Sequence, residues 1–189
     1  MISISTRNLR RLVLALTLSV APVAALAAAP AEAEVLNHYA DIALASYEDA
    51  LSTAKALDAA IDALIADPSA ATLDAARQAW KVARVPYQQT EAFRFGNPIV
   101  DEWEGRVNAW PLDEGLIDYV DASYGSESDS NGLYVANVIA NPTILIDGEP
   151  LDTTNVTPEL LQDNLQEAAG VESNVATGYH AIEFLLWGQ

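Results

Sequence analysis

Small and apolar side chains recur every three or four positions between residues 35 and 66, and this repeat restricts the fold more than any other feature. Its members are Leu36, Tyr39, Ala43, Tyr47, Ala50, Ala54, Leu57, Ile61 and Leu64. Acidic residues and Lys55 occupy the other faces, so the pattern predicts one long amphipathic helix. Residues 67–69, Asp-Pro-Ser, are expected to end it.

Further helices are predicted in the middle of the chain. A second helix is expected from about residue 71 to residue 95, with a kink at Pro86 because proline removes an interior hydrogen bond. Residues 99–110 look helical or irregular. A short helix with Pro111 in its first turn is expected to end near residues 124–125, where a polar loop begins.

The last third of the chain predicts two more helices. Residues 134–146 are ambiguous and fit a helix followed by an extended piece. Thr157 is a predicted N-cap, Pro158 fits the first helical position, and Gly170 is expected to close this helix after about residue 169. A final helix is expected to start at residues 172–174 and to continue to residue 189. Three or four long helices joined by loops predict an all-α helical bundle.

The first 29 residues have the pattern of a secretory signal peptide. Arg7, Arg10 and Arg11 precede an apolar stretch at residues 12–26, and small residues follow it. The apolar stretch is shorter than the roughly 20 residues that a membrane-spanning helix needs. We therefore expect export to the periplasm or cell envelope, a mature domain of residues 30–189, and no stable membrane insertion after cleavage.

Composition excludes several classes of function. The chain has no cysteine, which excludes disulfides, thiolate metal sites and a cysteine nucleophile. Its formal net charge of −18 repels phosphate backbones and anionic lipids, so nucleic acid is not an expected partner. The same charge suits a cation-binding protein, and equally a well-solvated protein without a ligand.

The predicted second helix carries charged residues in line with its apolar side. Five residues follow one another at steps of four, three, four and three: Trp80, Arg84, Tyr87, Glu91 and Arg94. This spacing places them on one stripe, and buried charges are costly without partners. We therefore predict that Trp80, Tyr87 and Glu91 lie on the same buried side of the helix. The alternative is that the stripe turns outward near the proline and forms surface ion pairs.

His180 and Glu183 are the second candidate for chemistry. At i and i+3 of a helix, the imidazole and the carboxylate project side by side. This spacing can chelate one cation or form a proton relay between the two side chains. A purely structural hydrogen-bonded pair is the alternative reading.

Three separated motifs resemble the imelysin-like proteins, also called the peptidase M75 family. The first is Gly178-x-His180-x-x-Glu183, followed by Phe-Leu-Leu-Trp-Gly. The second covers residues 79–95, and the third is Asn-Ala-Trp-Pro-Leu-Asp at residues 108–113. The motifs occur in the family's order and cover nearly all of the mature chain. The family is related to iron-regulated protein A and to the periplasmic component of ferrous iron uptake systems.

The resemblance implies a periplasmic or surface protein of two helical bundles, with the His-x-x-Glu pair facing a cleft between them. It implies a metal ion, with iron as one identity, and these candidate ligands: His180, Glu183, Glu91, Asp101 and Asp113. Neighbours that orient the ligands or support the structure are implied as well: Gly178, Trp80, Arg84, Tyr87, Arg94 and Trp110. The implied partners are envelope iron-uptake components.

Family members are commonly longer than this chain. The chain is therefore expected to hold an incomplete first bundle and to stop within the signature helix. Large apolar side chains of that helix would then lack part of their packing surface. This predicts an exposed apolar patch around Leu185, Leu186 and Trp187.

Binding of iron or another hard or borderline cation during envelope uptake is the favoured function, because carboxylates with one imidazole suit such ions. A metallopeptidase of the M75 type is the alternative. A zinc peptidase needs three protein ligands and a base, and the sequence contains no His-Glu-x-x-His, so enzyme activity is not favoured. A di-iron oxidase would need paired Glu-x-x-His motifs, in the reverse order. A metal-free structural envelope protein is the remaining alternative.

Overall fold

The structure is a computed structural model that describes residues 29–125 and 128–188. The chain divides into two compact units, Met1–Asn37 and His38–Gln189. Residues 1–28, which carry most of the predicted signal peptide, lie outside the described residues. Among the described residues, no helix is both long and apolar enough to cross a membrane. The candidate residues all lie in the second unit.

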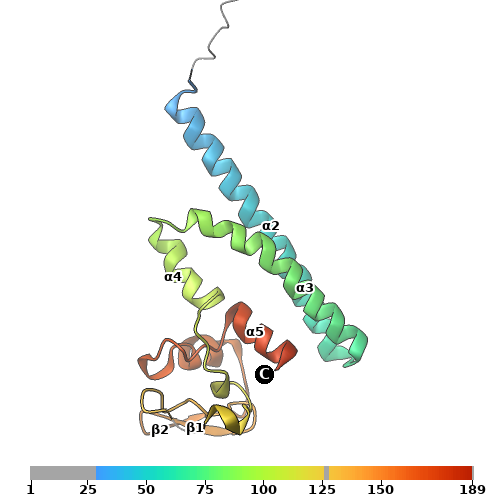
Figure 1. Cartoon of the computed structure of the whole chain (residues 1–189), viewed down its shortest axis with the longest axis vertical. Helices are drawn as coiled ribbons and strands as arrows, with labels where there is room; N and C mark the ends of the chain where they lie inside the picture. Colours follow the sequence, from blue (N-terminus) through green and yellow to red (C-terminus); the bar gives the residue numbers. More distant parts are fainter. Residues whose placement is uncertain (1–28, 126–127, 189) are drawn as a thin grey trace, which may run out of the picture. The chain divides into compact units, whose positions relative to one another are not determined.

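The two long predicted helices are present and lie side by side (Figure 1) as α2 (Glu32–Ala66) and α3 (Ala70–Gln89). A capping box starts α3, because Ser69 Oγ accepts from the Thr72 N–H at 3.2 Å and Thr72 Oγ1 accepts from the Ser69 N–H at 3.0 Å. Leu57 of α2 packs with Ala83 and Tyr87 of α3 in a buried cluster. The fold is therefore all-α, as expected, and contains a helical hairpin of α2 and α3.

The second helix ends earlier than predicted. Pro86 lies inside α3 without ending it, but α3 stops at Gln89 and a 3₁₀ turn, Thr90–Phe93, continues the chain. The Thr90 side chain is buried, and its Oγ1 donates to the Tyr87 carbonyl at 2.6 Å. This bond gives a carbonyl in the last turn of α3 a partner from outside the helix ladder.

The connection after α4 (Pro98–Val107) differs from the expected short helix. The Trp110–Pro111 peptide is cis, and a 3₁₀ turn at Glu114–Leu116 is followed by another at Ala122–Tyr124. The carbonyls of residues 115–117 accept from the N–H groups of residues 137–139 at 2.8 to 3.2 Å. In a helix those carbonyls would bond within their own segment. These backbone hydrogen bonds to residues 137–139 therefore take the place of the bonds of the predicted short helix.

The ambiguous segment at residues 134–146 forms turns and then a strand. Strand β1 (Thr143–Ile146) pairs antiparallel with β2 (Glu149–Asp152). Asp147 and Gly148 connect the strands with φ of 52° and 87°, the left-handed values that a two-residue type I′ turn requires. Ile144 of β1 joins a second buried cluster that also contains Leu116 and Leu165.

The helix predicted at residues 157–169 is capped as expected and then changes type. Thr157 Oγ1 accepts from the Leu160 N–H at 3.2 Å, which confirms the N-cap. A π-helix at Leu160–Leu165 follows, and the regular backbone ends there. A 3₁₀ turn, Ala168–Gly170, comes next, and the Glu167 N–H donates to the Asn174 carbonyl at 2.7 Å. This hydrogen bond joins two segments across a turn, so the helix ends before residue 169, where the sequence predicted its end.

The last helix, α5 (Gly178–Trp187), starts later than predicted because residues 173–177 are held in a buried loop. Asn174 is fully buried, and its Nδ2 donates to the Ala168 carbonyl at 2.8 Å. Leu185 is 57% exposed, but Leu186 is only 6% exposed and Trp187 is half-buried. The predicted apolar patch is therefore wrong for Leu186, since α5 turns that side chain inward.

Gly178 lies where α5 meets the end of α4. Its φ is +86°, and a Cβ atom built on it would lie 2.4 Å from the Val107 carbonyl oxygen. Carbon and oxygen atoms do not approach so closely, so any side chain here would force the two backbones apart. Glycine therefore permits the close approach of α5 to the end of α4.

We expect Gly178→Ala to destabilise the fold by at least about 1 kcal/mol more than Gly148→Ala, because it adds an overpacking cost. Gly148 has a φ of +87° but nothing within 4 Å of a built Cβ, so its variant carries only the left-handed strain of about 1–2 kcal/mol. Urea unfolding of both variants measures the difference. Equal losses of stability would show that this close approach tolerates a side chain.

Candidate functional site

The His180–Glu183 pair is formed on α5 as the i, i+3 spacing predicts. His180 Nδ1 and Glu183 Oε2 are 3.1 Å apart, and the two side chains are 17% and 43% exposed. The Trp110 ring, from the segment after α4, lies against the imidazole with 4.8 Å between ring centroids. The imidazole is thus held between a carboxylate and an aromatic ring, and water reaches the carboxylate.

The first three members of the stripe on α3 face α5. Trp80 Nε1 donates to the Tyr179 carbonyl at 2.9 Å. The Arg84 guanidinium lies over the rings of Tyr179, Tyr87 and Trp80, at 5.0, 5.6 and 5.7 Å from their centroids. Its Nη1 also donates to Asn108 Oδ1. A half-buried cation is therefore stabilised by aromatic faces and an amide oxygen.

Glu91 leaves this stripe and is exposed, so the predicted buried position is wrong for it. The residue lies in the 3₁₀ turn after α3, where each residue advances by about 120° instead of 100°. Its side chain is 40% exposed and pairs with Arg94 at 3.7 Å. The surface-pair alternative is correct at this end of the stripe.

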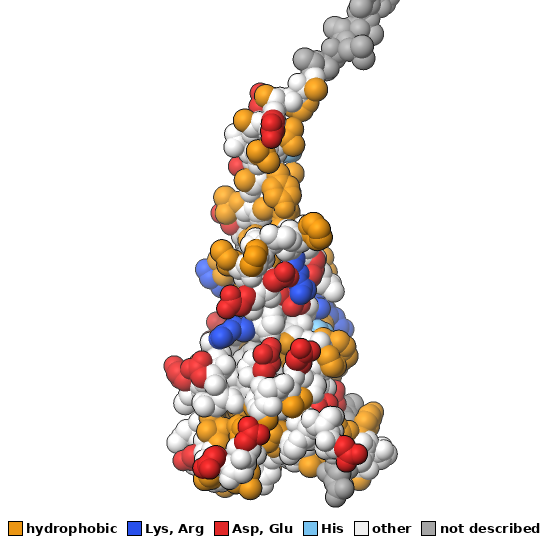
Figure 2. Space-filling view, turned by 90° about the vertical axis from the view of Figure 1, so that its left-hand side faces the viewer, with side chains coloured by type: hydrophobic (Ala, Val, Ile, Leu, Met, Phe, Trp, Pro, Cys, Tyr) orange, Lys and Arg blue, Asp and Glu red, His pale blue; other side chains and the backbone are white. Residues whose placement is uncertain are grey.

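Arg94 joins three carboxylates. Its Nε lies 2.5 Å from Asp101 Oδ1, and its Nη1 lies 3.3 Å from Glu104 Oε1 and 3.7 Å from Glu91 Oε2. The hydrogen bond with Asp101, followed by the charge of Glu104, raises the pKa of Arg94. On the face shown in Figure 2, basic side chains likewise lie beside acidic ones near the middle of the view. Glu91 and Asp101 therefore compensate a guanidinium here.

Asp113 has a third location. Its carboxylate accepts from Ser173 Oγ at 2.6 Å and from Asn131 Nδ2, while its N–H donates to the Ser173 carbonyl at 2.8 Å. Asn131 Nδ2 also donates to Asn174 Oδ1 at 2.8 Å. These bonds tie together the loops that precede α5.

The five candidate ligands thus lie in three separate groups. His180 and Glu183 form one pair, Glu91 and Asp101 meet at Arg94, and Asp113 binds the loops. Within residues 29–125 and 128–188, no group of three or more histidine, aspartate or glutamate side chains is placed to hold a metal ion. Sequence reasoning also missed Glu104 and Asn108, although Glu104 follows Asp101 by three positions and so shares its helical face.

Burial raises the pKa of two tyrosines beside the pair. For Tyr87, desolvation acts first and the charges of Glu104 and Glu91 add to it. For Tyr179, desolvation also acts first, while the Arg84 cation opposes it. Both phenols therefore stay protonated to more alkaline pH than an exposed tyrosine.

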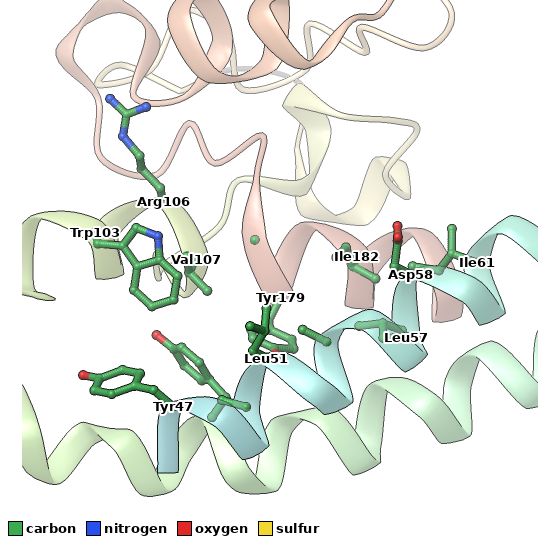
Figure 3. A pocket seen from close by; sticks show the side chains of 14 residues that line it. Tyr47, Leu51, Leu57, Asp58, Ile61, Trp103, Arg106, Val107, Tyr179 and Ile182 are labelled. Atoms are coloured by element: carbon green, nitrogen blue, oxygen red, sulfur yellow. The ribbon is translucent and has the colours of Figure 1, made fainter. Parts of the chain in front are cut away.

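An apolar groove of about 520 Å³ adjoins this region and is lined by residues of α2, α3, α4 and α5. Figure 3 shows Leu51, Leu57 and Ile61 along α2, opposite Ile182 of α5 and Val107 of α4. Neither His180 nor Glu183 is among its lining residues. The groove places Tyr179 in apolar surroundings, which agrees with the raised pKa of its phenol.

Comparison with known proteins gives a match to the imelysin family, peptidase M75, over residues 43–189. Iron-regulated protein A of Synechococcus elongatus is 40% identical over 76 residues. That match covers 40% of this chain and 21% of the relative, so the chain spans only a minor part of the relative's length in the alignment. The family match includes α3, α4 and α5.

We expect the free energy of unfolding of the wild-type chain to fall as pH rises above about 10, where unfolded tyrosine releases its proton but folded Tyr87 retains it. Tyr87→Phe removes one such proton and should reduce this slope by up to about 1.4 kcal/mol per pH unit. Urea unfolding between about pH 9 and 11 measures the slope. Tyr119→Phe, at a residue that is 68% exposed, is the control. Identical slopes in all three proteins would contradict the prediction.

Proposed function

The chain belongs to the imelysin family, and from this premise we propose that it binds a hard or borderline metal cation through His180 and Glu183. Iron is the proposed biological ion, because the relative that shares 40% identity over 76 residues is named an iron-regulated protein. The proposed setting is iron uptake in the cell envelope, after export.

The separation of the two donor atoms is the observation that carries this proposal. Two adjacent ligands of an octahedral ion, each about 2.1 Å from the metal, lie about 3.0 Å apart. His180 Nδ1 and Glu183 Oε2 are 3.1 Å apart, so their spacing matches that of two ligands of one ion, which both would bind after the two side chains rotate toward it. The same distance is that of a hydrogen bond between the two side chains. Metal binding would replace the proton that the two atoms share.

The chemistry of the donors agrees with this choice of ion. An imidazole nitrogen with a carboxylate oxygen suits ferrous iron, manganese and zinc better than soft ions, and the chain has no thiolate. Two protein ligands leave most positions of an octahedral ion to water or to other oxygen donors. A zinc peptidase needs three protein ligands and a base, so the pair favours binding over peptide hydrolysis.

The prediction is that His180→Ala and Glu183→Gln each weaken binding of ferrous iron or Zn²⁺ at least tenfold, which is about 1.4 kcal/mol. The first variant removes the imidazole donor, the second replaces the carboxylate by a neutral amide that binds cations more weakly, and both should leave helix α5 intact. Calorimetric titration under anaerobic conditions measures the affinity. Ca²⁺, which prefers oxygen ligands, should bind more weakly to the wild-type chain than either ion.

The matched control is His38→Ala, which removes the other histidine of the chain, at an exposed position of α2. It should bind both metals as the wild-type chain does. Equal affinity of the His180 and His38 variants would reject His180 as a ligand. A wild-type chain that binds neither metal would favour the metal-free structural role.

For export, protein purified from the envelope should have an N-terminus between Ala28 and Ala31, because small residues there follow the apolar stretch. N-terminal sequencing tests this directly. A chain that retains Met1 in that fraction would reject the proposed cleavage.

A further inference from the structure

Helix α5 presents three residues at steps of four: Tyr179, Glu183 and Trp187. Residues four apart lie above one another on one face, so Glu183 stands between two aromatic rings. The Trp80 ring of α3 contacts both of them edge-on, with centroids 6.4 Å from Tyr179 and 5.4 Å from Trp187. The face of α5 that carries the Glu183 carboxylate is therefore the face whose aromatic residues pack on Trp80.

Trp80 also binds the backbone of α5. Its Nε1 donates to the Tyr179 carbonyl at 2.9 Å. In a regular α-helix this carbonyl accepts the N–H of Glu183, four residues later. One oxygen thus takes part in the helical bond of the candidate ligand and in the contact with α3. If the Trp80 indole moves, the Tyr179 carbonyl in the first turn of α5 must move with it or lose this hydrogen bond.

The other end of α5 is held by the same helix. Arg77 Nε donates to the Leu186 carbonyl at 2.8 Å, and the Arg77 guanidinium lies 5.5 Å from the centroid of the Trp187 ring. Carbonyls in the last turn of a helix have no partner within the helix. Two residues of α3, three positions apart, therefore bind carbonyls near the two ends of α5.

We propose that Trp80 is a positioning residue which fixes the rotation of α5 about its own axis and so sets the location of His180 and Glu183. A helix with side chains has a radius of about 5–6 Å, so a rotation of about 20° moves a carboxylate by about 2 Å. This is as long as a metal–ligand bond. With α5 held by Trp80, Glu183 lies on the helical face of Tyr179 and Trp187, and His180 meets Trp110. The metal role of this pair rests on the function proposed above.

The test compares Trp80→Phe with Trp103→Phe. The first keeps an aromatic ring but removes the N–H donor to α5. The second is the same replacement in α4, where Trp103 contacts Tyr87, a residue of α3. The first readout is the imidazole NMR signals, since the Trp110 ring current shifts those of His180 and the chain's other histidine, His38, serves as internal reference. The second readout is the affinity for Zn²⁺ alone.

Trp80→Phe should move the His180 signals, leave those of His38 in place, and lower the Zn²⁺ affinity about tenfold or more, as loss of an orienting contact does. Trp103→Phe should change neither readout. Unmoved His180 signals in a folded Trp80→Phe protein would overturn the inference. If that variant does not fold, Trp80→Tyr replaces it, with circular dichroism as the check on folding.

The two proposals fail in different ways. If the wild-type chain binds no Zn²⁺, the proposed function fails, while the His180 signals still decide whether Trp80 positions the pair. If Zn²⁺ binds with equal affinity to the wild-type chain and to Trp80→Phe, and the His180 signals stay in place, the pair binds metal but Trp80 does not position it.

Discussion

The contact between α3 and α5 is the interaction on which the arrangement of the candidate site depends. Beside it, glycine at position 178 lets the start of α5 lie against the Val107 carbonyl at the end of α4. The contact between α3 and α5 requires aromatic side chains long enough to reach across from α3, and Trp80 and Tyr87 supply them. A helix of ten residues has little stability of its own, so packing of this kind is what keeps α5 folded.

The sequence predicts helices where the signal is local and repeated. The three-and-four repeat of α2 and the Thr157 cap were sufficient to place these elements. The β-hairpin was missed, although the dipeptide Asp147-Gly148 is a strong signal for a two-residue hairpin turn. The start of α5 could not be predicted, because it follows a loop in which Asn174 is buried. Asn174 is bonded to Asn131, which is distant in the sequence.

The same distinction applies to the site. His180 and Glu183 are three positions apart on one helix, so their contact follows from helical geometry alone. The meeting of Asp101 with Arg94 depends on how the chain turns after α3, and no periodicity encodes that turn. Because burying a charge is costly, we correctly predicted that Arg84 and Arg94 have partners. The sequence did not show that the partners of Arg84 are aromatic rings and those of Arg94 are carboxylates.

This difference between the two arginines determines how the region responds to its medium. Arg94 is surrounded by carboxylates near the surface, so high salt screens its interactions. The described contacts of Arg84 are with Asn108 and three aromatic rings, none of which carries a charge. High salt therefore weakens the contacts of Arg94 with α4 more than the aromatic contacts of Arg84. One cation of α3 and one just after its end therefore differ in their sensitivity to ionic strength.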